Sequence, residues 1–205
     1  MLFRSAAQAL GYLDLDPDKF RIDLMSLSAH KIYGPKGIGA LVIREGFPLE
    51  PSQYGGGQEL GLRSGTLPVP LIVGFAKAVE ITKNDQDGRN KRLLFFRNLL
   101  LSGLKKNISG LIVNGSIDQR LPHNLNITFP GVKGSQLHGQ LRRFIFCTSG
   151  SACSNGEASH VLKEIGLCKK DAEASIRMSI GRNTTEKDIK EAIEIITNIV
   201  INLRK

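Results

Sequence analysis

Apolar runs bounded by turn residues predict two short strands in the first part of the chain. Residues 22–27 and 38–43 are such runs, and their composition is typical of buried strands. Gly34-Pro35-Lys36-Gly37 punctuates the connection between them. Residues 51–66 are polar and rich in glycine, which predicts a loop, and Pro68 suits the first turn of a helix. The apolar positions of that helix are Val69, Ile72, Val73, Ala76 and Val79.

The pattern changes after a predicted break at 84–88. Helical spacing predicts a basic amphipathic helix over 89–106 and a last helix that begins near Thr185 and Asp188. The face of the last helix comprises Ile189, Ala192, Ile193, Ile196, Val200 and Leu203. Shorter patterns predict strands at 111–113, 125–129, 144–147 and 176–180, and a helix at 135–143.

These elements predict two units. Residues 1–85 resemble the end of an α/β domain with buried, parallel strands, and residues 86–205 resemble a compact α+β domain. The first unit begins with a helix-like segment (Ala6, Ala7 and Leu10) and offers only two or three strands. A parallel sheet needs more strands than that, so we expect the first unit to be incomplete.

Composition excludes several classes of protein. The chain has 205 residues, of which 41% are hydrophobic and 23% charged, as in an ordinary globular protein. No apolar stretch is long enough for a membrane span, and the start lacks the apolar core of a signal peptide. Three cysteines are too few for a disulfide scaffold or a structural metal site, so we expect a cytoplasmic protein.

The formal net charge of +9 suggests a nucleic acid, an acidic partner or an anionic cofactor. The short basic clusters have no interleaved aromatic residues, and the chain has no tryptophan. A solvated basic surface is therefore the favoured interpretation, and nucleic-acid binding is the weaker alternative.

Lys31 lies directly after the first predicted strand, in Ser28-Ala29-His30-Lys31. A lysine held at a strand end can form a Schiff base with pyridoxal 5'-phosphate, and small neighbours leave room for this cofactor. Ser28 and His30 are candidate donors to its phosphate. The alternative is an ordinary surface lysine.

Cys153 lies in a run of small and polar residues, 148–156, which predicts an exposed loop. An accessible cysteine suits a nucleophile, and an incidental loop cysteine is the alternative. Cys147 ends an apolar run and Cys168 follows another, so both are expected to be structural.

Two further segments carry candidate binding residues. The glycine-rich segment 55–66 includes Arg63, Ser64 and Thr66, which suit an anion. Arg177 lies in the alternating strand 176–180, where an inward-facing guanidinium can hold a carboxylate by two parallel hydrogen bonds. A solvent-facing strand arginine is the alternative.

Together these segments resemble the cysteine desulfurases, which are pyridoxal-phosphate enzymes of the aspartate-aminotransferase fold. The resemblance rests on Ser28-Ala29-His30-Lys31 with Tyr33-Gly34-Pro35-Lys36-Gly37, on the segment from Gly55 to Pro68, and on Ser149-Gly150-Ser151-Ala152-Cys153. It implies the C-terminal part of such an enzyme: a truncated large domain over 1–85 and a complete small domain over 86–205.

The resemblance also implies roles. Lys31 would bind the cofactor and move protons, while Ser28, His30 and Gln8 would contact its phosphate and ring oxygen. Cys153 would take the sulfur of L-cysteine as a persulfide and would be at most a transient iron–sulfur ligand. The remaining roles are Arg177 for the substrate carboxylate and Thr66 for the cofactor phosphate of a partner subunit, which implies a homodimer.

Two departures from the family's pattern qualify these roles. Ser5 stands where the family places the aspartate that pairs with the pyridine nitrogen, and a hydroxyl cannot supply that charge. The family's chains also extend well upstream of Met1, so activity of the chain alone is not expected. Other readings are a selenocysteine lyase, or a non-enzymatic module that relays sulfur or docks an iron–sulfur scaffold protein.

Overall fold

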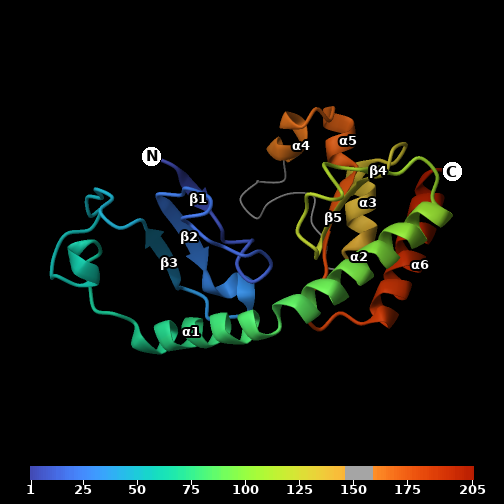
Figure 1. Cartoon of the computed structure of the whole chain (residues 1–205). Coiled ribbons are helices and arrows are strands. Elements are labelled where there is room, and N and C mark those ends of the chain that lie inside the picture. The colour runs from blue at the N-terminus through green and yellow to red at the C-terminus, as the bar shows by residue number, and fades with distance from the viewer. Residues whose placement is uncertain (146–158) are drawn as a thin grey trace. The chain divides into compact units, whose positions relative to one another are not determined.

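The computed structural model describes residues 1–145 and 159–205. The chain divides into two units, Met1–Gln86 and Asp87–Lys205, and each is described by itself (Figure 1). Whether these units are a partial large domain and a small domain stays a prediction. Among the described residues, no helix combines the length and the apolar composition that a membrane span requires.

The first unit contains a three-stranded sheet, sheet A, with the strand order β1-β2-β3. Its elements, in chain order, are β1 (Phe3–Ser5), β2 (Leu24–Ser28), the 3₁₀ helix η1 (Ala29–Ile32), β3 (Gly39–Ile43), the 3₁₀ helix η2 (Glu59–Gly61) and α1 (Val69–Asn84). The two predicted strands and the predicted helix of this half are therefore present, each with slightly shifted bounds.

The expectation of parallel pairing is wrong for β2 with β3, and the expectation of burial is wrong for β3. They pair antiparallel, with Leu24 opposite Ile43 and Ser28 opposite Gly39. The connection between them is a short turn, whereas a parallel pair needs a crossover of a dozen or more residues. Four of the five residues of β3 are exposed, because β3 is an edge strand of sheet A.

The start of the chain also differs from its expected helix. Phe3–Ser5 forms β1, which runs parallel to β2, and the following segment forms successive turns. The amide of Ala6 donates to Ser26 O at 2.9 Å, and the amide of Leu10 donates to Ala6 O at 3.0 Å. Ala6 is buried with Ile22 and Met25 in a small apolar cluster, so the helix-like spacing reflects this packing.

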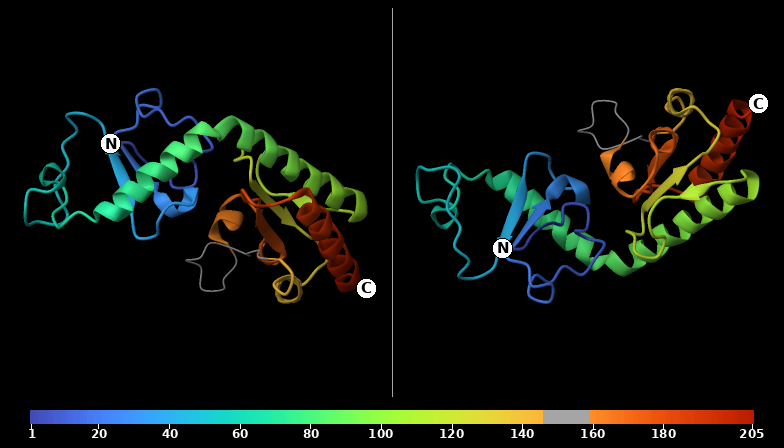
Figure 2. Two further views of the ribbon diagram at one scale, coloured as in Figure 1. Left: turned by 90° about the horizontal axis from the view of Figure 1, so that it is seen from below. Right: turned by 90° about the horizontal axis from the view of Figure 1, so that it is seen from above.

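The second unit contains sheet B, which is antiparallel throughout and has the order β4-β5-β6 (Figure 2). Its strands are β4 (Ile112–Val113), β5 (Asn124–Thr128) and β6 (Ser175–Ser179). Its helices are α2 (Gln86–Asn107), α3 (Gly134–Leu141), α4 (His160–Glu164), α5 (Lys169–Glu173) and α6 (Glu186–Leu203). The short helices α4 and α5 were not predicted.

The apolar face of sheet B packs against long helices. Ile176 and Met178 of β6 line a common apolar region with Leu141 of α3 and Ile196 of α6. α2 and α6 approach closely, since a Cβ on Gly103 would lie 2.4 Å from Cδ1 of Ile193. α6 begins as predicted: Thr185 and Asp188 form reciprocal side-chain to backbone bonds, a capping box.

Two boundaries in the second unit differ from expectation. The predicted break at 84–88 is reduced to Asp85, because α1 ends at Asn84 and α2 begins at Gln86. Phe144 and Ile145 do not form a strand but continue the turn after α3, with both amides bonded to Leu141 O. The other residues of the predicted strand 144–147 lie outside the described part of the chain.

Candidate functional site

Lys31 lies on a short turn with one buried and one exposed side. In the 3₁₀ helix η1, residues three apart share a face. Ala29 and Ile32 therefore point inward, where they pack with Phe75 and Ala78 of α1. His30 and Lys31 lie on the other side and are exposed. The sequence Ala-His-Lys-Ile thus presents the lysine amine while its neighbours anchor the turn.

Small residues hold α1 close to this turn. A Cβ on Gly34 would lie 2.9 Å from Ala29 O and 3.1 Å from Cβ of Ala78. A Cβ on Gly74 of α1 would lie 2.6 Å from Cγ of Pro35. The Gly34-Pro35 turn is therefore in close contact with α1, and a larger residue at either glycine would push the helix away from the turn.

The predicted phosphate donors meet at the end of β2. Ser28 is the last residue of β2, and its Oγ lies 2.9 Å from Nδ1 of His30. The parallel strand β1 ends at Ser5 at the same edge of sheet A, and the exposed Gln8 lies in the turn that follows. The carboxyl ends of parallel strands form the usual ligand-binding edge of an α/β sheet. The topology therefore brings Gln8, Ser28, His30 and Lys31 to one edge.

These residues fit the phosphate and the aldehyde of pyridoxal phosphate but not its ring nitrogen. A hydroxyl, an imidazole and a nearby amine match an anionic phosphate and an aldehyde. Position 5, at the end of β1, carries the exposed neutral hydroxyl of Ser5. A carboxylate at this position would have stabilised a protonated ring nitrogen, and serine does not replace it.

The glycine-rich segment uses two of its three predicted anion ligands internally. The Ser64 side chain is only 4% exposed, and its Oγ donates to Gly56 O at 2.7 Å. The Arg63 guanidinium donates to Ser64 O at 2.6 Å, and the Gly65 amide donates to Oε1 of Gln58. The Ser64 hydroxyl is therefore engaged in closing the loop, whereas anion binding by the exposed Arg63 stays a prediction. Thr66 is exposed and keeps its hydroxyl at the surface.

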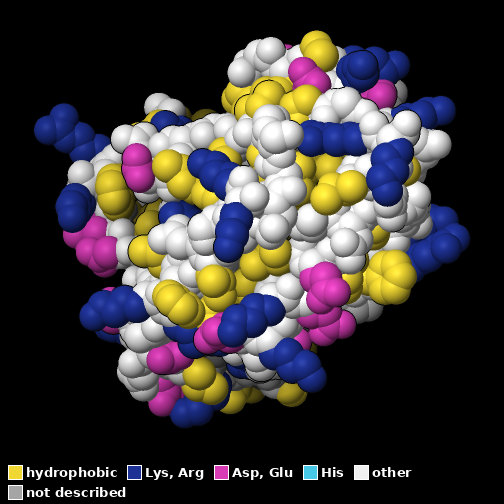
Figure 3. All heavy atoms as spheres, turned by 90° about the vertical axis from the view of Figure 1, so that its right-hand side faces the viewer, with side chains coloured by type: hydrophobic (Ala, Val, Ile, Leu, Met, Phe, Trp, Pro, Cys, Tyr) yellow, Lys and Arg dark blue, Asp and Glu magenta, His cyan; other side chains and the backbone are white. Residues whose placement is uncertain are grey.

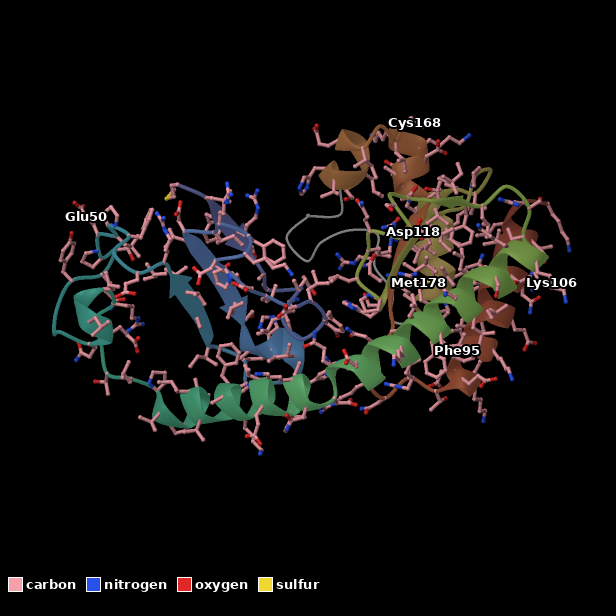
Figure 4. The ribbon with its side chains drawn as sticks, in the orientation of Figure 1. Glu50, Phe95, Lys106, Asp118, Cys168 and Met178 are labelled. Atoms are coloured by element: carbon pink, nitrogen blue, oxygen red, sulfur yellow. The ribbon has the colours of Figure 1, made fainter. Side chains whose placement is uncertain are left out.

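Arg177 lies in the middle of β6, in the second unit. The strand alternates as predicted: Ile176 and Met178 are buried, whereas Arg177 between them is half-buried on the opposite face. Figure 4 labels Met178, which marks the buried side of the strand.

Sequence reasoning missed the polar network beside Arg177. Asn114 is 4% exposed, and its Nδ2 donates to Oδ1 of Asn126 at 2.7 Å and to Oγ1 of Thr128 at 2.9 Å. Thr128 Oγ1 also lies 2.7 Å from Oγ of Ser175. The alternation Asn124-x-Asn126-x-Thr128 was the available signal, because it predicts a strand with one polar face.

The cysteines are only partly described. Cys153 and Cys147 lie outside the described residues, so the nucleophile assignment is neither supported nor contradicted. Cys168 is exposed, contrary to the expectation of a structural cysteine, and its Sγ lies 3.3 Å from Oδ2 of Asp171 (Figure 4). Leu167 takes the inner position in this turn, and Cys168 precedes the first residue of α5.

The basic residues of α2 are less solvated than the sequence suggests. Arg89 and Arg97 are buried, and burial lowers the pKa of Arg97 below its ordinary value. The guanidinium of Arg92 donates to Thr184 O at 3.0 Å and to Arg182 O at 2.7 Å, which fixes the loop after β6. Elsewhere Lys and Arg are scattered among apolar and neutral groups on the face shown in Figure 3. Part of the positive charge is therefore structural.

Comparisons with known proteins agree with the resemblance seen in the sequence. The aminotransferase class-V family model matches residues 2–191. "Cysteine desulfurase IscS" from Vibrio vulnificus (strain YJ016) is 48% identical over 203 residues, which are 97% of this chain and 50% of the relative. The same-named protein from Shewanella piezotolerans is 45% identical over 204 residues, which are 98% of this chain and 50% of the relative.

Solved structures give the same answer for the fold. A structure titled "NIFS-LIKE PROTEIN" superposes with a TM-score of 0.86 at 35% identity, covering 98% of this chain and 52% of the other. A NifS-like protein from Rickettsia africae gives 0.85 at 28% identity, covering 96% and 52%. The predicted fold class, a partial pyridoxal-phosphate transferase fold, is confirmed. The chain spans about half the length of the curated relatives it matches, and it belongs to the aminotransferase class-V family.

Proposed function

We propose that the chain carries the lysine, cysteine and arginine of a pyridoxal-phosphate-dependent cysteine desulfurase that converts L-cysteine to alanine. The observation that carries this proposal is the η1 turn. It presents Lys31 next to the Ser28–His30 pair while Ala29 and Ile32 anchor it against α1. The 48% sequence identity to a cysteine desulfurase, over 97% of this chain, supports the same activity. A cytoplasmic location fits this proposal.

Each residue then has a defined task. Ser28 and His30 bind the cofactor phosphate, and Gln8 contacts the ring oxygen. The cofactor, when bound, withdraws electrons from the substrate α-carbon. Lys31 removes and returns the proton at that carbon, and Arg177 holds the substrate carboxylate.

The sulfur leaves through Cys153. Its thiolate attacks the substrate sulfur and an S–S bond forms, while the bond between the sulfur and the substrate β-carbon breaks with its electron pair going to the β-carbon. Protonation of the β-carbon gives the methyl group of alanine, and Cys153 keeps the sulfur as a persulfide. A sulfur-acceptor or iron–sulfur scaffold protein would take it from there.

The glycine-rich segment supports a homodimer. Leu60 is 96% exposed in the short helix η2 of this segment, and Tyr54, just before the glycine run, is 77% exposed. Large apolar side chains at such a position favour contact with another surface. In this arrangement Thr66 contacts the cofactor phosphate of the partner subunit.

Selective modification of Lys31 tests the site. The chain is incubated with increasing pyridoxal phosphate, reduced with borohydride, and digested for mass spectrometry. We expect Lys31 to be labelled at a lower concentration than Lys36, an exposed lysine in the same turn. Ser28→Ala and His30→Ala should remove this preference, because the phosphate then loses its donors. Equal labelling of both lysines in the parent chain would contradict the proposal.

Product analysis tests the reaction itself. With L-cysteine and pyridoxal phosphate, the proposal requires alanine together with a persulfide on the Cys153 peptide, and Cys153→Ser should abolish the persulfide. A separately expressed upstream half of the Vibrio vulnificus relative supplies the part of the fold that this chain does not cover. Alanine from selenocysteine but not cysteine would point to a lyase. A persulfide that needs an added donor and no cofactor would point to a relay.

A further inference from the structure

One face of sheet B is polar where the other is part of the apolar core. β5 contributes Asn124, Asn126 and Thr128, and β6 contributes Ser175 and Arg177. Asn114, directly after β4, joins them through hydrogen bonds. We call these six residues the polar face of sheet B.

The strand register places Asn126 directly opposite Arg177. The amide of Asn114 donates to Asn126 O at 3.0 Å, so the backbone groups of Asn126 point toward β4 and away from β6. Asn126 and Arg177 are therefore a non-hydrogen-bonded pair, the kind in which opposing side chains stand closest. Thr128 and Ser175, two positions along, form the same kind of pair and their hydroxyl oxygens lie 2.7 Å apart.

Asn114 fixes which way the Asn126 carboxamide faces. Its Nδ2 donates to Oδ1 of Asn126, and its own Oδ1 accepts from Thr128 Oγ1 at 3.0 Å. A flipped Asn126 would bring two NH₂ groups together. Oδ1 of Asn126 thus faces β4, and its NH₂ group is directed away from Asn114.

The pair offers donors only. Within residues 1–145 and 159–205, Arg177 takes part in no ion pair, and Nδ2 of Asn126 donates to no acceptor. Arg177 carries five N–H donors and Asn126 two, on adjacent side chains that are both half-buried. A small planar anion with two oxygens is the ligand that complements such a pair.

We propose that Asn126 is a second ligand of the substrate α-carboxylate, beside Arg177, and that Asn114 is the positioning residue that orients it. The identity of the substrate rests on the proposed function, whereas carboxylate binding at this pair does not. Arg177 neutralises the carboxylate, and the fixed NH₂ of Asn126 sets the position of its second oxygen. Amines or thiols without a carboxylate would not be retained here.

The test measures carboxylate binding without cofactor or turnover. Propionate is titrated into the ¹⁵N-labelled full chain, and the NMR signals of the Asn126 side-chain amide and of Arg177 Nε–H are followed. Propionamide, which has the same shape and no charge, is the ligand control. We expect both signals to move together and to saturate with propionate only.

Two matched variants separate Asn126 from a general charge effect. Asn126→Asp keeps the acceptor for Asn114 and replaces the NH₂ donor by a negative charge, so propionate affinity should fall by at least about tenfold. Asn124→Asp adds the same charge to the same face of β5, two residues from Asn126 and opposite Ser179. It should weaken binding less than about threefold. Far-ultraviolet circular dichroism checks that both variants fold.

The outcomes are distinct. If only the Arg177 signal moves, or if the two variants weaken binding equally, Asn126 is not a carboxylate ligand and the role of Arg177 stands alone. If neither signal moves, the inference is wrong. If both signals move but L-cysteine gives no alanine, the inference stands and the proposed function fails.

Discussion

Ser5 is the residue at which this chain departs most from the chemistry that its other residues support. Lys31, Ser28 and His30 lie at the carboxyl edge of sheet A, and Ser5 ends the neighbouring strand at that same edge. The exposed hydroxyl is hydrogen-bonding but neutral. Electron withdrawal by a bound pyridoxal ring depends on a charged partner for its nitrogen, so position 5 limits the strength of the site.

Ser5→Asp should strengthen cofactor binding. The new carboxylate can form a charge-assisted hydrogen bond to the ring nitrogen, which corresponds to about a tenfold gain in affinity for pyridoxal phosphate. Fluorescence titration of the full chain measures this. Ser5→Asn is the control. Asparagine has the size of aspartate but no charge, so this variant should gain little affinity. An equal gain with asparagine would show that charge at position 5 is not what the site lacks.

The alternation of β6 was predicted because the local sequence decides it: Ile176 and Met178 are buried, and Arg177 between them is half-buried. The inward positions of Ala29 and Ile32 follow from their spacing within one turn but were not predicted. The internal hydrogen bonds of Arg63 and Ser64 were not foreseen, because their partners, the carbonyl groups of Ser64 and Gly56, depend on how the loop closes. Asn114 was missed because its partners are up to 61 positions away along the chain.

At the scale of elements, backbone close approach limits what the second unit tolerates. Gly134 is the first residue of α3, and a Cβ there would lie 2.2 Å from the backbone oxygen of Glu173 in α5. Neither backbone can move aside like a flexible side chain. The glycine therefore sets how closely α3 and α5 pack.

Gly134→Ala should destabilise the second unit by about 1–3 kcal/mol, the usual cost of an added methyl group in a well-packed site. Urea unfolding followed by circular dichroism measures the change in the free energy of unfolding. Gly139→Ala in the same helix is the matched control, since no heavy atom of the described residues outside the local helix backbone lies within 4 Å of its Cβ position. We expect it to be neutral or to stabilise by up to about 1 kcal/mol through helix propensity. Equal effects of the two substitutions would contradict this account.

The type of each longer element was predictable from periodicity. The direction in which β2 and β3 pair was also predictable but was not predicted. The last helix, α6, follows from its apolar spacing and its capping residues. The antiparallel pairing of β2 and β3 was available from the shortness of their connection, which leaves no room for a crossover. Strand β1 and helices α4 and α5 are so short that periodicity carries little signal.

At the scale of the whole molecule, the first unit leaves apolar surface uncovered. Leu41 and Val42 of the edge strand β3 are 45% and 36% exposed, and Val69 and Val73 of α1 are exposed as well. Unpaired strand edges and apolar faces favour association.

Stability of the second unit should depend on pH through buried histidines. Burial, with a smaller contribution from the positive charge of Arg89, lowers the pKa of His123 to about 4. Burial lowers the pKa of His138 as well. A depressed histidine pKa means that the fold favours the neutral ring, so stability is full above the unfolded value near 6.5 and falls as the pH drops toward 4.

The contribution of His123 amounts to at most about 3 kcal/mol, lost between pH 6.5 and 4. Urea unfolding at a series of pH values should show this slope. His123→Gln should flatten the slope, whatever its effect on stability at pH 8, because glutamine does not titrate. An unchanged slope in this variant would assign the acid sensitivity to other groups.

The sequence alone determined the family, the helices and strands with strong periodicity, and the candidates for the reactive residues, because these depend on local spacing and on motifs. The tertiary structure decided which polar side chains are engaged inside the fold and how the strands pair. It used Arg63 and Ser64 to close their loop, turned β3 antiparallel, buried Arg89 and Arg97, and set Asn126 beside Arg177. These features depend on how a loop closes and on how strands and helices pack on one another, which the periodicity of a single segment does not encode.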